Sequence, residues 1–454
     1  MPDPWRYAGT GTVAVVGASL SGLLAAAGAA EAGRRVVVLE RDTLAGADGW
    51  RRGVPQGRQI HVLLHRGLVA AEELVPGLEV ALEGAGAVRV NTGELPWYGP
   101  FGWQPTWIRS YDLLSVTRPL LERLVRERVL ARPGVELVDG VRVRGLRPAA
   151  AGWQLLCSDG LRVEADMVVD ASGRSSRMPQ WLAELGYAVP EPEVLDASLA
   201  YACQVFRSPG APLRTGVVVG ATPERPRSGL GLPVEGGQWL VSAAGYGPER
   251  PGRDMDLRSY LARLREPVLA EITATLEPVG EVAVHRQTSN RRHGYGLARD
   301  WPEGLLVVGD ALCCFNPLYG QGITVGALQA GVLRDALRRR GPLATRGLQR
   351  DLRRVADVPW SVATTEDTRY LPGARPTIKQ RLLSGWTNEL AAIATAGHQR
   401  AVRTFGGVYH LMTPPVELFH PALVAGVVRG RLSRLPGPAA RPAVLQALVD
   451  APAR

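Results

Sequence analysis

Lysine is almost absent from this sequence of 454 residues, because Lys379 is the only lysine among 53 basic residues and all the others are arginine. Cysteine is scarce as well. The four thiols are Cys157, Cys203, Cys313 and Cys314, and no two of them form a C-x-x-C pair. This number and spacing argue against a disulfide framework and against a zinc site. They favour the reducing environment of the cytoplasm.

Long apolar runs are also missing. No run reaches the ~18 residues of a membrane-spanning helix, and the first residues lack the basic-then-apolar order of a signal peptide. The seven histidines are scattered without a metal-ligand spacing. We therefore expect a cytoplasmic protein that does not span a membrane and holds no metal. An apolar share of 46% is nevertheless enough for a large core, which argues against wholesale disorder.

The net charge of +10 is distributed unevenly along the chain. Residues 331–454 hold 19 cations and 8 anions, whereas residues 1–330 are close to neutral. A basic balance is typical of proteins that bind nucleic acid or an anionic surface. Here the arginines are dispersed over expected helices, which favours a solvated helical face and no nucleic acid. Docking of an anionic partner, such as a carrier protein or a membrane surface, stays open as an alternative.

The first 40 residues carry the pattern of a β-α-β unit. Residues 12–16 form a short β-branched apolar run, typical of a buried parallel strand. A helix of small residues is expected over 23–32, and a second strand over 35–39 ends at Glu40. This order of elements is typical of a dinucleotide-binding fold.

The turn between the first strand and the helix strengthens this interpretation. Gly17-Ala18-Ser19-Leu20-Ser21-Gly22 is a G-x-G-x-x-G fingerprint in which Ser19 replaces the second glycine. Because serine is small, backbone amides and the helix dipole can still approach a pyrophosphate. Glu40 stands at the distance that suits a carboxylate accepting hydrogen bonds from an adenosine ribose.

A second motif distinguishes FAD from NAD. An expected strand over 305–308 leads into Gly309-Asp310, and Asn316-Pro317-Leu318-Tyr319-Gly320-Gln321-Gly322 then opens a helix. Asp310 is placed to bind ribityl or ribose hydroxyls. Backbone amides at a helix start favour the negative charge of a reduced flavin, and a flavin ring against bare backbone requires glycine. We therefore expect Pro317, Gly320, Gln321 and Gly322 to position the flavin.

A third segment, Asp166–Gly173, is an expected strand ending in Asp170. The three segments, in this order, resemble the para-hydroxybenzoate-hydroxylase-fold flavoprotein monooxygenases. More narrowly, Arg52-Gly53-Val54-Pro55-Gln56-Gly57-Arg58-Gln59-Ile60-His61 and the 316–322 motif look like one bacterial branch. That branch contains the FAD epoxidases of polyether biosynthesis, of the monensin and lasalocid type, and is similar to squalene epoxidase. The resemblance spans about residues 10–440.

The resemblance implies further cofactor contacts. Arg118 stands where the family places an Arg or Gln facing the FAD pyrophosphate, and the backbone of Val143 where it usually meets adenine. Arg41 is expected along the adenosine, and Arg52, Arg58 and His61 in a loop that covers the flavin. The rest of the expected cofactor set is Gly17, Ser19, Gly22, Glu40, Asp170, Asp310, Pro317, Gly320 and Gly322.

The resemblance also implies the chemistry, since the sequence shows no Ser/His/Asp set, no H-E-x-x-H and no meaningful carboxylate pair. In this family reduced FAD reacts with O₂ to form a C4a-hydroperoxide, which transfers oxygen to an alkene or an aromatic carbon. We expect an FAD monooxygenase of bacterial secondary metabolism, such as antibiotic biosynthesis. It would epoxidise an alkene or hydroxylate a ring in a polyketide- or terpenoid-like substrate, without a dedicated catalytic side chain. NAD(P)H would reduce the flavin directly or through a separate flavin reductase.

Other activities of flavoproteins remain open at this point. One is a flavin oxidase, dehydrogenase or reductase. Another is a non-redox cyclase in which FAD has a structural role. A flavin halogenase is disfavoured, because its Trp-x-Trp-x-Ile motif is absent.

Two groups of aromatic residues are candidates for contact with a hydrophobic small-molecule substrate. Aromatic and apolar walls suit a polyene or a fused ring. The alternative is that these rings pack in the core of a sheet. The first group is Trp97, Tyr98, Phe101, Trp103 and Trp107; the second is Tyr201, Phe206, Trp239 and, more weakly, Gln204 and Tyr246.

The expected fold is of the α/β class, as an α+β composite. A Rossmann-like FAD-binding domain would carry an inserted antiparallel β-sheet substrate domain and C-terminal helices. The FAD-binding domain would comprise residues 10–80, 113–180 and 286–345. The substrate sheet would comprise 81–112 and 181–285, the helical region 346–440, and a loose tail 441–454.

Overall fold

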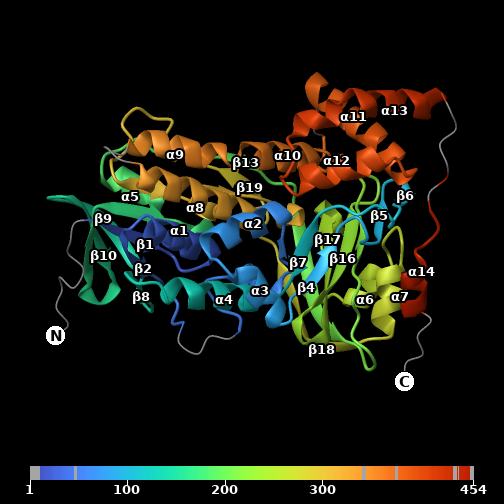
Figure 1. Ribbon diagram of the computed structural model, residues 1–454, viewed down its shortest axis with the longest axis horizontal. Helices are drawn as coiled ribbons and strands as arrows, with labels where there is room; N and C mark the ends of the chain where they lie inside the picture. The colour runs from blue at the N-terminus through green and yellow to red at the C-terminus, as the bar shows by residue number, and fades with distance from the viewer. Residues whose placement is uncertain are drawn as a thin grey trace.

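The chain builds two principal sheets, one parallel and one mostly antiparallel, with helices packed on both (Figure 1). The computed structural model describes residues 11–44, 49–339, 344–373, 377–432, 437 and 439–449. Residues 10, 45–48, 340–343, 374–376, 433–436, 438 and 450–454, which belong to the expected domains and tail, lie outside this description. The architecture is the expected mixture of α/β units, antiparallel sheets and C-terminal helices.

The parallel sheet has the strand order β20-β12-β1-β2-β8. Its strands are β1 (Thr12–Val16), β2 (Arg35–Leu39), β8 (Val135–Val138), β12 (Met167–Asp170) and β20 (Leu305–Val307). Val13 pairs with Met167 on one side and with Val36 on the other. All residues of β1 and β12 are buried, as is usual for parallel strands covered on both faces. The strand ends of all three motifs are thereby brought to one edge.

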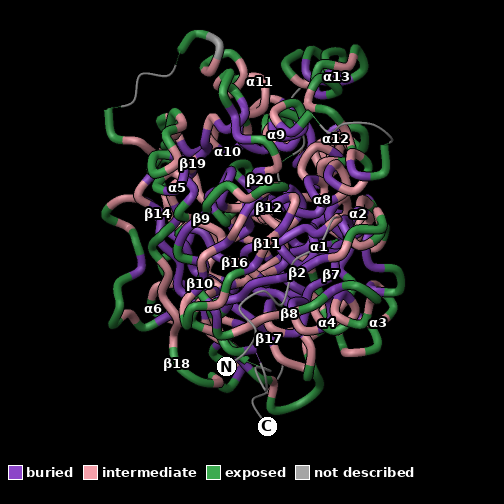
Figure 2. Tube along the Cα trace, turned by 90° about the vertical axis from the view of Figure 1, so that its left-hand side faces the viewer, coloured by how far each residue is buried: buried purple, intermediate pink, exposed green. Residues whose placement is uncertain are grey.

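Helices and a small sheet cover the parallel sheet. Helices α1 (Leu20–Glu31) and α8 (Gly322–Arg338) pack against each other, and α4 (Arg118–Leu130) packs on α1. The antiparallel sheet β9 (Val143–Ala149), β10 (Gly152–Cys157) and β11 (Arg162–Ala165) contacts β1 and β12. Figure 2 shows the resulting concentration of buried chain in the middle of the molecule.

The seven-stranded sheet, called the antiparallel sheet below, has the strand order β18-β14-β17-β16-β15-β5-β6. Its neighbouring strands pair antiparallel except β15 and β5, which are parallel. Side chains alternate between its two faces. One face packs on α6 (Leu257–Leu261), α7 (Val268–Ala274) and α14 (Ala443–Val449). On the other face, Leu232 packs against Val62, Leu64 and Leu113. Its strands are β5 (Trp97–Gly99), β6 (Gly102–Trp103), β14 (Leu199–Arg207), β15 (Val217–Val219), β16 (Arg227–Val234), β17 (Gln238–Tyr246) and β18 (Glu277–His285).

Two further sheets and the remaining helices complete the fold. The first sheet is β3 (Val62–Leu63), β7 (Asp112–Ser115) and β4 (Val88–Asn91); the second is β13 (Glu193–Leu195), β19 (Asn290–Arg292) and β21 (Cys313–Cys314). The helices are α2 (His65–Leu74), α3 (Leu78–Gly84), α5 (Met178–Glu184), α9 (Thr345–Arg354), α10 (Asp357–Thr368), α11 (Ile378–Thr395), α12 (Gln399–Tyr409) and α13 (Pro421–Leu432). Helices α11, α12 and α13 share a small core of their own, near the edge of the antiparallel sheet (Figure 1).

The predicted tail is wrong over the residues that the structure describes. Residues 443–449 form α14, and the side chain of Leu445 is fully buried against α7. Arg441 makes ion pairs with Glu266 and Glu271 just before this helix. Buried leucine and paired charge together explain why a segment rich in Pro and Ala is ordered here. No described helix is both long and apolar enough to cross a bilayer.

Candidate functional site

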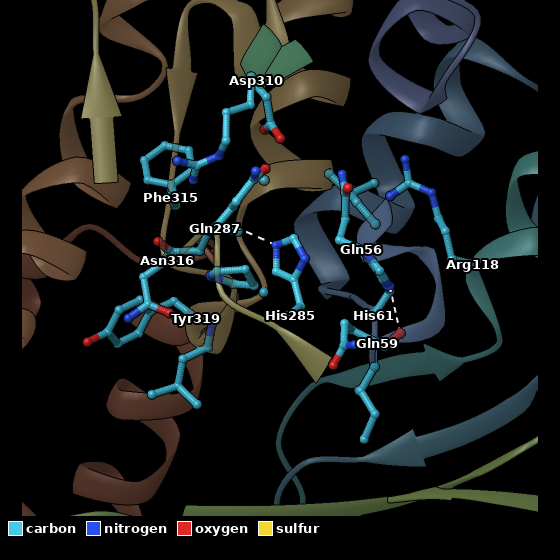
Figure 3. Close-up of a pocket in the computed structure, with 18 of the residues that line it drawn as sticks. Gln56, Gln59, His61, Arg118, His285, Gln287, Asp310, Phe315, Asn316 and Tyr319 are labelled. Atoms are coloured by element: carbon cyan, nitrogen blue, oxygen red, sulfur yellow. Dashed lines mark hydrogen bonds between the residues drawn. The ribbon is translucent and has the colours of Figure 1, made fainter. Parts of the chain in front are cut away.

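A large cavity is lined by residues from both principal sheets. Its volume of about 1090 Å³ is above the usual range for one small ligand, about 300–1,000 Å³. Residues from the three sequence motifs and from the antiparallel sheet line it together. Figure 3 shows side chains from these separate segments converging on it.

The first motif forms a tight turn at the cavity wall. Gly17 has φ +106°, and a Cβ at this position would lie 2.6 Å from the carbonyl oxygen of Ala171. A Cβ on Gly22 would lie 1.9 Å from the Gly17 oxygen, so this glycine packs the helix against the turn and does not itself line the cavity. Glu40 accepts a hydrogen bond from the Ala18 amide at 2.7 Å. Backbone is thus exposed to the cavity beside the start of α1.

A buried network of charges surrounds this turn. Arg51 lies 3.2 Å from Glu40 and 2.6 Å from Glu122. Arg118 donates to the Ser19 hydroxyl at 2.8 Å and contacts Glu122 at 3.3 Å. Burial disfavours the Arg51 cation, but Glu122 and Glu40 outweigh it and hold the pKa of Arg51 above its ordinary value. The network keeps two guanidinium groups fixed at the cavity wall.

The Asp170 carboxylate organises a turn and stays out of the cavity. It is fully buried and accepts hydrogen bonds from the Ser172 amide at 2.9 Å, from the Ser172 hydroxyl at 2.6 Å and from the Ser176 hydroxyl. Burial raises the pKa of Asp170. The turn that it holds, residues 171–175, lines the cavity directly beside Gly17.

The second motif supplies another glycine turn. Gly320 has φ +64°, and a Cβ there would meet the Val62 side chain at 2.5 Å. The side-chain oxygen of Gln321 is buried without a hydrogen-bond partner among the described residues. The Asp310 carboxylate lines the same wall, and burial raises its pKa. The unpaired Gln321 oxygen, the Asp310 carboxylate and the Gly320 backbone therefore belong to one part of the cavity wall. This combination suits a ligand with polar groups and a flat ring.

A carboxylate from the C-terminal helices anchors this turn. Asp367 of α10 is almost completely buried and accepts from the side-chain amides of Asn290 at 2.6 Å and Asn316 at 2.9 Å. The Tyr319 hydroxyl donates to it at 3.0 Å and the Tyr246 hydroxyl at 3.2 Å. Burial raises the pKa of Asp367. Helix α10 is thereby tied to the turn at 316–320.

Most of the expected cofactor residues lie together around the cavity. Three of them do not line it: Gly22, Asp170 and Arg58, of which Arg58 is exposed. The expected residues that line the cavity are Gly17, Ser19, Glu40, Arg41, Arg52, His61, Arg118, Val143, Asp310, Pro317, Gly320, Gln321 and Gly322.

The substrate candidates divide according to sheet face. Trp97 and Tyr201 line the cavity, and so does Tyr246. The others require correction. Phe206 and Trp239 point to the opposite face and are buried against α6 and α7, because side chains alternate along each strand. Trp103 is buried in the same core with Tyr98 against it, Phe101 is exposed beside a second, small depression, and Trp107 is 63% exposed.

Several residues of the cavity were not predicted from the sequence. Arg369 and Tyr370 directly follow α10, in a region that carries no motif. His285 ends β18, a strand that the hydropathy pattern did not reveal, and Gln287 follows it. The missed wall residues with polar side chains include Arg51, Gln59, Arg174, Ser242, His285, Gln287, Arg369 and Tyr370. Of these residues, only Arg51 had a signal in the sequence, because it directly precedes the recognised segment 52–61.

Comparison with known proteins identifies a relative. No family model matches the chain. It is 32% identical to Protein Rv3254 of Mycobacterium tuberculosis strain H37Rv over 359 residues, which cover 75% of this chain and 76% of the relative. The chain belongs to the family of Protein Rv3254.

The fold of this Rv3254-family protein is shared with solved flavoproteins. A flavoprotein/dehydrogenase from Cytophaga hutchinsonii superposes with a TM-score of 0.67 at 15% identity, covering 93% of this chain and 98% of that one. p-Nitrophenol 4-monooxygenase PnpA from Pseudomonas putida gives a TM-score of 0.61 at 18% identity, over 88% of this chain and 98% of PnpA. The Diels-Alderase PyrE3 of pyrroindomycin biosynthesis gives a TM-score of 0.61 at 19% identity, over 89% of this chain and 81% of PyrE3. The fold is therefore the one found in flavoprotein monooxygenases.

The described part of this Rv3254-family protein contains no group of three or more His, Cys, Asp or Glu side chains able to hold a metal ion. All four cysteines are free and buried, and burial raises the pKa of Cys157 to about 12 and of Cys203 to about 11. These thiols remain protonated at neutral pH and behave as small apolar groups.

Proposed function

We propose that this protein is an FAD-dependent monooxygenase of secondary metabolism. The observation that carries the proposal is the meeting of two glycine turns, at Gly17 and at Gly320, on one cavity with an unpaired Gln321 oxygen. One turn suits a pyrophosphate at a helix start, and the other leaves backbone bare for a flat ring system. The fold neighbours with monooxygenase activity and with a role in antibiotic biosynthesis support the same assignment.

The residues present fit FAD along the length of the cavity. The adenosine end of FAD would be held by Glu40, Arg41 and the Val143 backbone. The pyrophosphate would be held by Arg118 and the start of α1. The ribityl chain would bind to Asp310, and the flavin ring would lie against residues 317–322. Arg52 would cover the flavin from the loop side, where His61 also lines the cavity.

Bound FAD would supply the redox chemistry and the activation of O₂. The protein's part is to orient the substrate and exclude water. The antiparallel sheet turns Leu230, Leu232 and Trp97 toward the cavity, and Val62 and Leu113 come from β3 and β7. This apolar wall suits a polyketide- or terpenoid-like substrate, and no dedicated catalytic side chain is required for oxygen transfer. Epoxidation of an alkene, as in the polyether branch, and hydroxylation of a ring are both within this chemistry.

We also propose the wider arrangement that the sequence suggested. The FAD-binding part comprises residues 10–80, 113–180 and 286–345, and the substrate part 81–112 and 181–285, because the strands of each sheet come from these segments. NAD(P)H reduces the flavin directly or through a separate flavin reductase, in the cytoplasm. The basic helices after residue 345 would serve for docking a carrier protein.

Oxygen-18 labelling tests this proposal. The purified protein is supplied with FAD, NADPH or a flavin reductase, ¹⁸O₂ and a panel of polyaromatic phenols and polyenes, and the products are analysed by mass spectrometry. A product that carries one ¹⁸O atom is expected. A desaturated or cyclised product without ¹⁸O would instead assign the protein to the oxidases or to the non-redox cyclases.

A further inference from the structure

Two histidines stand at the substrate end of the cavity, one from each part of the fold. His61 precedes β3, beside the turn at Gly320, and His285 ends β18 of the antiparallel sheet. Figure 3 shows both rings between Gln59 and the turn at Asn316 and Tyr319. Only His61 was singled out by the sequence, as a flavin contact.

A hydrogen bond across the two parts brings these rings together. The Gln59 side-chain amide donates to the Ala283 carbonyl oxygen at 2.9 Å. Each histidine lies two residues beyond a partner in this hydrogen bond, and both histidines line the cavity.

Backbone carbonyls fix which nitrogen of each ring carries the proton. His61 Nδ1 lies 2.9 Å from the Gln59 carbonyl oxygen, and His285 Nε2 lies 3.2 Å from the Gln287 carbonyl oxygen. A carbonyl oxygen only accepts, so each of these nitrogens is the N–H donor. In a neutral ring the other nitrogen then carries a lone pair. His61 Nε2 and His285 Nδ1 have no partner among the described residues.

Both rings are held in the neutral form by their surroundings. Burial and the positive charge of Arg118 lower the pKa of His61 to about 3, and His285 acts in the same direction. Burial also lowers the pKa of His285, and the charge of Arg174 adds to this effect. The two free nitrogens are therefore hydrogen-bond acceptors and not cations at neutral pH.

From this geometry we infer that His61 and His285 form a hydroxyl-recognition site, and that the substrate is a neutral phenol or enol on a ring system. The substrate O–H donates to an imidazole nitrogen, which increases electron density on the ring that is to be oxygenated. Two acceptors also suit a ring with two hydroxyl groups. A carboxylate or a phenolate would meet a lone pair instead of a donor, so the site selects the protonated form. The inference rests on the proposed function, since it names the substrate class of that cavity.

The probe pair 2-naphthol and 2-methoxynaphthalene tests the inference on the FAD-loaded protein by equilibrium dialysis at pH 7. The methyl ether has a similar shape and is more apolar, so an apolar cavity without acceptors would not favour the naphthol. Sites built to hydrogen-bond a hydroxyl discriminate strongly against analogues that lack it. We expect 2-naphthol to bind at least tenfold more tightly.

Variants then assign the preference to the two rings. In the double variant His61→Leu/His285→Leu the preference for 2-naphthol should fall below threefold, and His61→Gln/His285→Gln, which keeps an acceptor, should restore part of it. His420→Leu, outside the cavity, is the matched control and should keep the full preference. FAD content and melting temperature are measured for each variant.

The inference is overturned if the FAD-loaded protein binds both probes equally, or if the preference survives in the double leucine variant. An unchanged preference with loss of FAD in that variant would assign the imidazoles to the cofactor, which also overturns it. These outcomes leave the proposed monooxygenase function standing. Absence of FAD from the wild-type protein would contradict that function separately.

Discussion

At the scale of single residues, the cavity is built from side chains that are fixed before any ligand arrives. Arg118 bonds to Ser19 and lies against Glu122, and Arg51 is held by Glu122 and Glu40. Fixed guanidinium groups need little reordering when they meet an anion, so the cost of binding is reduced. The same carboxylates keep these cations stable in a buried place.

Replacing Arg118 with leucine should weaken FAD binding by about tenfold or more, since a charge-assisted hydrogen bond contributes about 1.5–3 kcal/mol. Isothermal titration of the apoprotein with FAD measures this loss. Arg126→Leu, on the same helix but outside the cavity wall, is the control and should bind FAD normally. Equal affinities for the two variants would remove Arg118 from the cofactor site.

At the scale of elements, helix α10 and the turn at 316–320 form one unit through Asp367. In Asp367→Asn one oxygen becomes an amide that faces Asn290, Asn316 and two tyrosine hydroxyls, all of them donors. Unsatisfied buried donors cost about 1–3 kcal/mol each. We therefore expect a loss of about 2–4 kcal/mol in the free energy of unfolding together with weaker FAD binding.

Urea unfolding and FAD titration check this prediction together. Asp351→Asn, on the exposed side of α9, serves as the control and should match the wild type in both. Normal stability and normal FAD affinity in Asp367→Asn would show that α10 does not support the turn.

The short helix α14 offers a second test, through neighbouring residues with opposite exposure. Leu445 is fully buried against α7, whereas Val444 is 47% exposed. Leu445→Ala should cost about 2–3 kcal/mol, and Val444→Ala less than about 0.5 kcal/mol. Thermal unfolding compares the two. Equal melting temperatures would mean that α14 does not pack on the antiparallel sheet in solution.

The sequence predicted the elements that a local pattern of residues is enough to determine. Strands β1 and β2 fall on the expected residues, because β-branched apolar runs next to glycine turns allow few alternatives. Helix α1 begins at Leu20, three residues earlier than expected, since the fingerprint itself forms its first turn. Helix α4 begins only at Arg118, because residues 112–115 pair with β3 and β4.

The rest of the site depends on contacts between distant segments, which no local pattern encodes. Asp367 joins the turn at 316–320 from about 50 residues away. His285 reaches the cavity only because β18 pairs with β14 beside Tyr201. Likewise, the strand register decides whether Phe206 and Trp239 point to the cavity or to the core on the other face of the sheet. Their aromatic character, which made them substrate candidates, suits a core equally well.

At the scale of the whole molecule, the excess of positive charge and the cavity lie mostly in different parts of the chain. The cavity draws its arginines mainly from the near-neutral first 330 residues, while the basic last quarter forms α9 to α14. Several of these C-terminal arginines form ion pairs, such as Arg431 with Glu389 and Arg354 with Asp351. The excess positive charge therefore lies mostly away from the cavity wall.

Stability should fall as the solution is acidified, because several histidines are buried in neutral form. Burial lowers the pKa of His410 to about 4, whereas in the unfolded chain it is near 6.5. Unfolding then takes up a proton below pH 6.5, which destabilises the folded state progressively as the pH falls toward 4. Between pH 7 and 5 this single group accounts for a loss of up to about 2 kcal/mol.

A variant isolates this contribution from that of the buried carboxylates. His410→Asn should be less stable than the wild type at pH 7, because it loses hydrogen bonds to Thr92 and to the His65 amide. The gap between the two proteins should narrow at pH 5. Urea unfolding at both pH values gives the comparison, and a constant gap would mean that His410 titrates normally in the folded protein.

Cofactor stoichiometry tests whether the two glycine turns, at Gly17 and Gly320, enclose one FAD. After reconstitution with FAD and removal of the excess, the wild-type protein should retain close to one FAD per chain, identified by mass spectrometry. Gly320→Val should retain almost none, because its Cβ would clash with Val62 at a positive φ, while Gly331→Val, where a Cβ meets open space, should retain the wild-type amount. A wild-type protein without FAD, or a fully loaded Gly320→Val variant, would contradict the account.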